Sequence, residues 1–277
     1  MFDFCNSKCA IMGILNITND SFYDGGKYIT KNKALDHCRE MIDEGVDIID
    51  VGAISTKPGF DINNIIPIEE EKERIRTIIW ALKSNFDVAV SVDTFRTEVA
   101  DEALQLGADI INDQYGLNYD DGMAEVIQKY DCTCVLMHNK DCSGYDDFIT
   151  CVKEDLKSMV RKALNTGIKP EKIILDPGIG FGKTPQQNMQ VLKHLKEIGE
   201  LGYPLLLGCS RKSFIGAVLN NDVDERLYGT LATTAYGYIN SASIFRVHDV
   251  KSNVEVLKML KAIEDSDKTN LQAKALK

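Results

Sequence analysis

The chain has 277 residues, 44% of them hydrophobic, which is enough to bury a large core in one or two domains. Its formal net charge of −10 argues against nucleic acid or an anionic membrane surface as a general partner, and its longest apolar runs are too short to span a membrane. Because Met1 to Cys9 has no long apolar core, no signal peptide is expected, so we predict a cytoplasmic protein with reduced cysteines.

The first informative stretch combines a short apolar run with a dense polar loop. Residues 11–15 suit a strand that is buried on both faces, and Asn16, Asp20 and Asp24 follow it. An apolar strand that ends in a loop rich in hydrogen-bonding side chains is the repeating unit of an α/β barrel.

This unit recurs along the whole chain. Eight strands are expected, at 11–15, 47–52, 88–92, 109–111, 132–136, 172–175, 204–208 and 243–248. Helices are expected at 30–45, 67–84, 98–106, 123–130, 147–166, from 184, at 226–239 and at 252–263. Gly167 after one helix and Pro67 and Pro185 in the first turns of two others support these boundaries.

The even alternation, without a linker or a change of composition, predicts a single α/β domain, a (β/α)8 TIM barrel over residues 1–265. The polar tail at 266–277 is expected to be frayed. A doubly wound open sheet is the alternative architecture. It would be expected to carry a GxGxxG dinucleotide motif after its first strand, where the sequence has none.

The carboxyl ends of the expected strands are mostly polar or charged, and barrel enzymes place their active sites there. These ends carry Asn16, Ser55, Lys57, Asp93, Asn112, Met137, His138, Asp176, Lys212, Arg246 and His248. Any one polar loop residue is ordinary. However, charged residues that adjoin buried strands, such as Asp93 and Arg246, must be paired or bound to a ligand.

These residue types fit a flat heterocycle that carries amino and ring N–H donors. The carboxylates of Asp93 and Asp176 accept such donors, and the amide of Asn112 both donates and accepts. The guanidinium of Arg246 can stack on the ring, and Lys212 can meet a ring oxygen.

A phosphate group is the second expected ligand feature. Asn16 and His248 could bind it near the ends of the seventh and eighth strands, where barrels often hold phosphate. A hard cation such as Mg2+ would sit well between phosphate oxygens and Asn16.

Competing motifs are weaker. Residues 178–184 resemble a P-loop, but Pro177 stands where that motif needs its first glycine. His138 is open to two interpretations, as an acid–base group or as a structural residue, whereas His37 and His194 lie in predicted helices and are expected at the surface.

Zinc binding is the alternative interpretation of the cysteines. Cys132 and Cys134 are the only close pair, and the CxxC spacing of common zinc sites does not occur. Metal binding by cysteine is therefore not favoured.

Six motifs in order resemble the dihydropteroate synthase family over residues 11–263. They are the opening loop 11–26, Ser91–Thr94, Ile111–Asp113, Leu175–Phe181, Ser210–Lys212 and Arg246–His248. The resemblance implies a transferase of folate biosynthesis that joins 6-hydroxymethyl-7,8-dihydropterin diphosphate to 4-aminobenzoate. The products would be 7,8-dihydropteroate and diphosphate, with Mg2+ present.

The resemblance also implies roles for residues at matching positions. The pterin ring would be held by Asp93, Asn112, Asp176 and Lys212, lined by Met137 and Phe181, and stacked on by Arg246. The diphosphate and its metal would be bound by Asn16, Arg246 and His248, with Asn16 as the metal ligand. The 4-aminobenzoate would be received by Ser213, Lys212 and two loops that carry Phe22, Asp24, Thr56, Lys57 and Pro58.

Three positions depart from the family pattern. Asn19 replaces the usual proline in the first loop, and Ala53 and Lys57 replace glycine and arginine in the second. Because lysine lacks the two-pronged grip of arginine on a phosphate, this change bears on diphosphate affinity and on the response to sulfonamides.

Two other functions stay open from the sequence. One is a pterin-binding methyltransferase domain, which would share the ring contacts but would not need Ser210–Ser213. The other is a catalytically idle, pterin-binding regulator, which the altered loops would suit.

The resemblance further implies a homodimer formed through the last helices.

Overall fold

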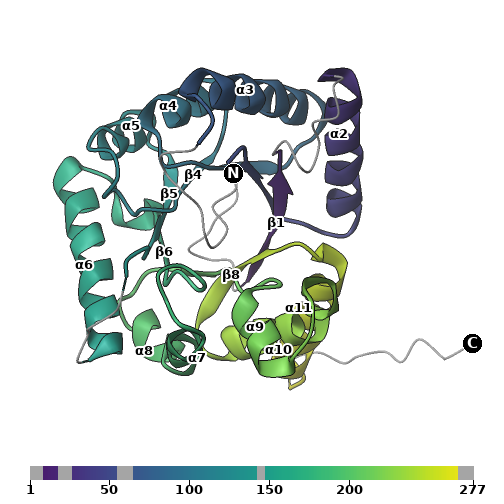
Figure 1. The fold of residues 1–277 in the computed structure, drawn as a ribbon, viewed down its shortest axis with the longest axis vertical. Helices are drawn as coiled ribbons and strands as arrows, with labels where there is room; N and C mark the ends of the chain where they lie inside the picture. Colours follow the sequence, from purple (N-terminus) through teal and green to yellow (C-terminus); the bar gives the residue numbers. More distant parts are fainter. Residues whose placement is uncertain (1–8, 18–26, 55–64, 142–146, 268–277) are drawn as a thin grey trace, which may run out of the picture.

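The computed structural model describes residues 9–17, 27–54, 65–141 and 147–267. Eight parallel strands form a closed barrel in the order β1 to β8, and helices surround it (Figure 1). The strands are β1 (Ala10–Asn16), β2 (Ile48–Gly52), β3 (Ala89–Asp93), β4 (Ile110–Asp113), β5 (Thr133–Met137), β6 (Ile173–Asp176), β7 (Leu205–Leu207) and β8 (Ala242–Val247). This closure confirms the predicted TIM barrel and excludes the open sheet.

The helices of the described chain follow the strands in sequence. They are α2 (Lys27–Asp43), α3 (Ile68–Asn85), α4 (Thr97–Gln105), α5 (Met123–Tyr130), α6 (Phe148–Thr166), α7 (Pro185–Lys193), α8 (Leu195–Gly199), α9 (Ser213–Leu219), α10 (Leu227–Ile239) and α11 (Val250–Glu264), with short 3-10 turns at Pro170–Lys172 and Val223–Glu225. Helix α9 was not expected, and the helix predicted to begin at residue 184 is divided at His194 into α7 and α8. Most of the tail predicted to fray lies outside the described residues.

Local signals explain several helix boundaries. Thr184 forms a capping box with Gln187 at the start of α7, and Pro185 occupies the first turn. Asp147 accepts the backbone N–H of Thr150 at the start of α6, which ends at Gly167 with a φ of 96°.

Strand periodicity decides which side chains face the mouth of the barrel. The inner core contains one apolar residue from each of several strands, including Ile48, Ile110, Ile174 and Ile244. Because side chains alternate along a strand, the residues two positions further on face the same way. These residues are Asp50, Asn112, Asp176 and Arg246. The parallel strands therefore direct polar side chains to one end of a sealed apolar core.

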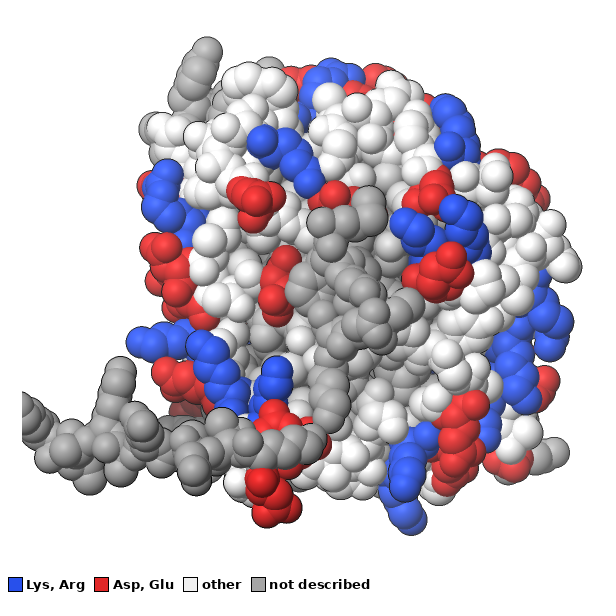
Figure 2. All heavy atoms as spheres, turned by 180° about the vertical axis from the view of Figure 1, so that it is seen from behind, with Lys and Arg blue, Asp and Glu red and all other residues white. Residues whose placement is uncertain are grey.

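One face of the outer surface carries charges of both signs. On the face seen in Figure 2, Lys and Arg side chains are interspersed with Asp and Glu. Within the described residues, no helix has the length and apolar character needed to cross a membrane.

Candidate active site

Arg246 lies between two buried carboxylates. Its Nε donates to Asp50 Oδ2 at 2.6 Å, and its Nη2 donates to Asp93 Oδ2 at 2.8 Å. Asn112 Nδ2 also donates to Asp50 Oδ2, at 3.2 Å. Strands β2, β3, β4 and β8 each supply one of these side chains, so barrel closure brings distant parts of the chain into one hydrogen-bonded cluster.

The charge of Asp93 is set by its neighbours. Burial raises the pKa of Asp93 to about 7, although the positive charge of Arg246 acts in the opposite direction. The negative charge of Asp50 raises this pKa further, whereas the hydrogen bond from Gln114 Nε2 to Asp93 Oδ1, of 2.5 Å, lowers it. Asp93 therefore changes its charge near neutral pH.

Asp176 and Lys212 supply further charges at the same end of the barrel. Asp176 Oδ1 accepts the backbone N–H of Gly178 at 2.7 Å. Burial raises the pKa of Asp176, and the Gly178 bond and the charge of Lys212 oppose this rise. Burial and the charge of Arg246 lower the pKa of Lys212 to about 8, and Lys212 Nζ lies 4.1 Å from the centre of the Phe181 ring. Lys212 thus lies over an aromatic ring and interacts electrostatically with Asp176.

We refer to these six converging side chains as the rim cluster. It consists of Asp50, Asp93, Asn112, Asp176, Lys212 and Arg246. The cluster offers hydrogen-bond donors and acceptors from six strands or strand ends, and it can therefore surround a flat polar ligand.

Asn16 lies at the edge of the rim cluster. It pairs in register with Gly52, where an added Cβ would lie 3.3 Å from Asn16 Oδ1 and 3.6 Å from Asp93 Cβ. Glycine at position 52 therefore leaves the space in which the Asn16 amide approaches Asp93.

His248 follows β8 and is tied to Ser210. The Ser210 hydroxyl lies 2.9 Å from His248 Nδ1, and the His248 backbone N–H donates to Ser210 Oγ at 3.1 Å. Part of the His248 side chain is open to solvent, but partial burial of its ring and the positive charge of Arg246 lower its pKa. His248 is thus held next to the cluster by Ser210.

His138 is enclosed by structural partners. Lys183 Nζ donates to His138 Nδ1 at 2.9 Å, and His138 Nε2 lies 3.2 Å from Asp155 Oδ2. Burial and the charge of Lys183 lower the pKa of His138 to about 4. These contacts favour the structural interpretation of His138 over the acid–base one.

Lys183 also holds the loop between β6 and α7. Its Nζ donates to the carbonyl oxygens of His138, Gly178 and Phe181, at 3.1, 3.0 and 3.0 Å. Because Phe181 lies against Lys212, Lys183 fixes the shape of the loop on which the cation of the rim cluster rests.

Two arginines hold the described stems of the signature loops. Arg74 Nη1 donates to the carbonyl oxygens of Ile17 and Ala53, at 3.3 and 3.4 Å. Arg96 Nη1 donates to Ile66 O at 2.9 Å. Residue 17 precedes the first signature loop and residues 53 and 66 flank the second, so the first loop begins, and the second begins and ends, next to an anchored carbonyl group.

The remaining predicted site residues differ in how they are placed. Met137 ends β5, is buried and pairs in register with Asp176. Ser213 begins α9 and is exposed. The predicted loop residues lie outside the described part of the chain: Asn19, Phe22, Asp24, Thr56, Lys57 and Pro58.

Three residues that were not predicted contact the site or its neighbours. Asp50, Gln114 and Lys183 contact Arg246, Asp93 and His138, respectively. A signal for Asp50 was present, because a carboxylate two residues after the inward-facing Ile48 must also face inward. Gln114 similarly continues the inward positions of β4.

The close cysteine pair of the sequence lies in the core. Cys132 and Cys134 lie in the apolar layer between the barrel and the helices, and burial raises the pKa of Cys132 to about 12. The described residues contain no group of three or more His, Cys, Asp or Glu side chains that could hold a metal ion.

Comparison with known proteins agrees with this geometry. Residues 12–248 match the model of the pterin binding enzyme family. The dihydropteroate synthase of Clostridium beijerinckii is 50% identical over 250 residues, which cover 90% of this chain and 92% of that protein.

Solved structures give the same result. The dihydropteroate synthase of Clostridium difficile, crystallised in the presence of pteroic acid, has a TM-score of 0.90 at 46% identity and covers 95% of this chain and 99% of its own. The Xanthomonas albilineans dihydropteroate synthase with 4-aminobenzoic acid has a TM-score of 0.88 at 35% identity and covers 94% of each chain.

A parallel barrel with a rim of converging polar groups is the architecture of a pterin-binding enzyme, and the chain belongs to that family. Its relatives within the family are dihydropteroate synthases, and its activity is that of this transferase. The reaction joins 6-hydroxymethyl-7,8-dihydropterin diphosphate to 4-aminobenzoate and releases 7,8-dihydropteroate and diphosphate.

Proposed function

We propose that the rim cluster binds the pterin ring and that the transfer takes place beside it. The carboxylates of Asp93 and Asp176 would accept the amino and ring N–H donors, and the amide of Asn112 would donate and accept. Lys212 would donate to a ring oxygen or nitrogen. The observation that carries this proposal is the convergence of these buried groups at one end of the barrel.

Arg246 would have a double role. Its Nε and Nη2 are held by Asp50 and Asp93, which leaves a guanidinium plane of fixed orientation for stacking on the pterin. Its positive charge would also attract the diphosphate, together with the neighbouring His248 and Asn16. Met137 and Phe181 would supply apolar contacts to the ring.

Mg2+ is part of this proposal. Mg2+ usually keeps several waters and takes few protein ligands besides substrate phosphates, which fits a site whose protein donor is the Asn16 amide oxygen. The bound ion would neutralise charge on the departing diphosphate. The rest of the chemistry requires positioning by the chain itself.

The proposed mechanism needs no protein nucleophile. The bond between the pterin methylene carbon and the diphosphate oxygen breaks with its electron pair on oxygen, which leaves a cation delocalised into the ring. The negative charges of Asp93 and Asp176 favour this cation. The aniline nitrogen of 4-aminobenzoate then attacks the methylene carbon and loses a proton, so orientation contributes more than activation.

The 4-aminobenzoate would lie between Lys212, Ser213 and the two signature loops. We assign Phe22, Asp24, Thr56, Lys57 and Pro58 to this part of the site because of the family resemblance. The anchoring of the loop stems by Arg74 and Arg96 supports the assignment, since it fixes where both loops leave the barrel.

We also propose that the enzyme is a homodimer through α10 and α11. Helix α10 has no charged residue, and its outward side chains include Tyr228 and Ile239, which are 81% and 68% exposed. On the neighbouring α11, Met259 is 62% exposed. A second copy of the chain would cover this apolar face.

A cytoplasmic location is supported by free cysteines such as Cys38 and Cys209.

The direct test is product formation. The purified chain is incubated with the pterin diphosphate, 4-aminobenzoate and Mg2+, and dihydropteroate is measured. Asp93→Ala and Lys212→Ala are expected to lower turnover by at least about a hundredfold, because each removes a charged ring contact. Full activity in either variant would refute the site. Substitution of Gln105, which is exposed on α4, provides a surface control.

A further inference from the structure

Gln114 is a buried polar residue next to Asp93. It follows β4 directly and continues the inward-facing positions of Ile110 and Asn112. Its side chain is 6% exposed, and its Nε2 donates to Asp93 Oδ1 at 2.5 Å. Its Oε1 is buried and makes no hydrogen bond within the described structure.

The two hydrogen bonds to Asp93 come from different kinds of donor. Asp93 Oδ2 accepts from the guanidinium of Arg246 at 2.8 Å, and Asp93 Oδ1 accepts from the neutral amide of Gln114. Because the amide nitrogen is used by Asp93, the orientation of the Gln114 amide is set, and its oxygen is the group left to bind elsewhere.

A buried amide oxygen without a donor weakens the folded state, so such a group in a ligand site calls for a partner. A pterin ring carries amino and ring N–H donors. Asp50 Oδ1 and Ser91 Oγ are also buried without a hydrogen bond in the described residues, but they lie one level deeper, on β2 and β3, below Asp93. Gln114 instead lies two residues beyond Asn112, which pairs in register with Asp93, and therefore nearer to the open end of the barrel.

We propose that Gln114 is a specificity-determining residue for the pterin: its Nε2 orients Asp93, and its Oε1 accepts a hydrogen bond from an N–H of the ring. This inference rests on the proposed function, in which Asp93 contacts the same ring. Gln114 and Asp93 then act as one acceptor pair that recognises two neighbouring donors of the ligand.

The inference is tested by calorimetric titration of 6-hydroxymethylpterin, without diphosphate, between pH 5 and 9. Gln114→Met keeps the length of the side chain but removes both polar groups. We expect its Kd at pH 8 to rise about tenfold, because a donor to a carboxylate and an acceptor for the ring are lost together.

The pH dependence distinguishes this role from simple packing. Binding to ionised Asp93 weakens as the pH falls through the pKa of Asp93, which is about 7. Loss of the Gln114 bond, which lowers that pKa, moves the midpoint of binding to higher pH. The other charged groups that act on Asp93 stay in place: Asp50, Glu71, Lys212 and Arg246.

Gln105→Met is the matched control. Gln105 Nε2 also donates to a carboxylate, Asp101 Oδ2, at 2.6 Å, but on the exposed surface of α4. Its Kd and pH midpoint are expected to equal those of the unmodified protein. An unchanged Kd and an unchanged midpoint in Gln114→Met would overturn the inference.

Asp93→Asn separates this inference from the proposed function. If Asp93→Asn binds the pterin as tightly as the unmodified protein, the proposed ring site fails. If Asp93→Asn weakens binding and Gln114→Met does not, only the role of Gln114 fails. A crystal structure of the unmodified protein with the pterin gives an answer that does not depend on the folding of a variant: Gln114 Oε1 is expected within about 3.2 Å of a ring nitrogen. A distance beyond hydrogen-bonding range would overturn the inference.

Discussion

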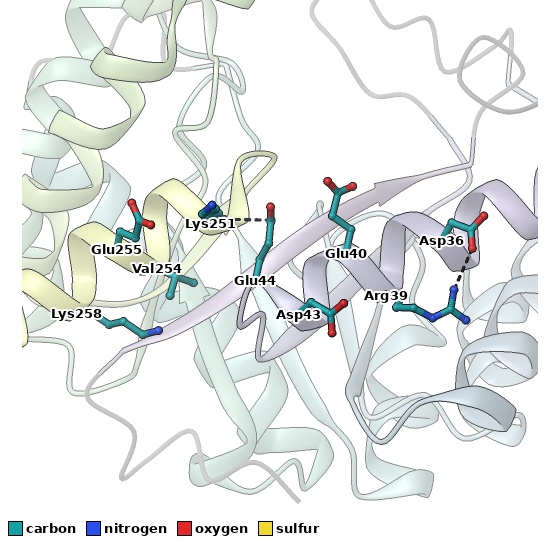
Figure 3. Close-up of a pocket in the computed structure, with 9 residues that line it drawn as sticks. All are labelled: Asp36, Arg39, Glu40, Asp43, Glu44, Lys251, Val254, Glu255 and Lys258. Carbon is teal, nitrogen blue, oxygen red and sulfur yellow. Dashed lines mark hydrogen bonds and ion pairs between the residues drawn. The ribbon is translucent and has the colours of Figure 1, made fainter. Parts of the chain in front are cut away.

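The rim cluster and the outer groove between α2 and α11 both contain acidic and basic side chains, but the charges are buried in the cluster and exposed to solvent in the groove. The groove has a volume of about 560 Å3 and is lined by Asp36, Arg39, Glu40, Asp43, Glu44, Lys251, Val254, Glu255 and Lys258 (Figure 3). Its interactions lie at the exposed surface, such as Arg39 with Asp36 at 3.0 Å and the hydrogen bond of 3.2 Å from the backbone N–H of Lys251 to Glu44. The cluster instead joins carboxylates from separate strands to one arginine in a buried setting.

A groove lined by charged side chains is therefore not by itself an active site. Exposed ion pairs are screened by water and contribute little, whereas buried charges must be balanced by specific partners or by ligand. The groove can lose a charge at small cost. The rim cluster cannot, because each of its charges sets the protonation or orientation of another.

The largest effect is expected when Arg246, the cation that Asp50 and Asp93 share, is removed from the rim cluster. Arg246→Met leaves Asp50 and Asp93 facing each other without compensation. We expect kcat/KM to fall about a thousandfold and unfolding free energy to fall by about 3 kcal/mol at pH 8. Steady-state kinetics and urea denaturation measure the two effects. Activity within tenfold of the unmodified enzyme would contradict the central role of Arg246.

The next largest effect is expected in the pH dependence of kcat/KM, which reports the charges of Asp93 and Lys212. Asp93, with a pKa of about 7, loses its charge as the pH falls, and Lys212, with a pKa of about 8, loses its charge as the pH rises. We therefore expect kcat/KM to be highest between about pH 7 and 8 and to fall about tenfold per unit on either side. A flat profile from pH 5 to 9 would contradict these roles for both groups.

A smaller effect is expected from the hydrogen bonds with which Lys183 holds the loop between β6 and α7. Lys183→Met removes the donors to His138, Gly178 and Phe181 without touching the rim cluster directly. We expect KM for the pterin diphosphate to rise about tenfold with a smaller change in kcat, because the support for Phe181 and Lys212 is loosened. Lys193→Met, on α7, is the control. Equal kinetics for both variants would contradict the proposed support of Phe181 and Lys212 by Lys183.

The smallest effect is expected in the groove. Glu40→Gln removes an exposed charge that lines the groove on α2. Unfolding free energy should change by less than about 0.5 kcal/mol and kcat/KM by less than about twofold. A larger change in kcat/KM would mean that the groove and the reaction are coupled.

The barrel could be predicted because its signals are local and repeated. Each apolar run that ends in a polar loop identifies a strand, and parallel strands must send their ends to the same side. Helix α9 was missed because seven residues are too few to show a helical pattern beside an already assigned loop.

The contacts of the site were harder to predict than its position. Asp50 looks like an exception inside a buried strand until barrel closure brings Arg246 next to it. Gln114 was not singled out, because the predicted strand ends at Ile111 and a single sequence does not show that a residue three positions later still contacts Asp93. Predicted loop residues such as Phe22 and Lys57 lie outside the described chain, so their roles stay predictions.

The most direct measurement compares one residue from each region in a single binding experiment. Calorimetric titration of 6-hydroxymethyl-7,8-dihydropterin diphosphate is carried out with Asp50→Asn, from the rim cluster, and with Glu44→Gln, from the groove. We predict a Kd at least about tenfold weaker for Asp50→Asn, because Arg246 loses the negative charge with which it pairs and Asn112 loses a carboxylate acceptor, and a Kd within twofold for Glu44→Gln. Unchanged binding in Asp50→Asn, or weaker binding only in Glu44→Gln, would contradict the account.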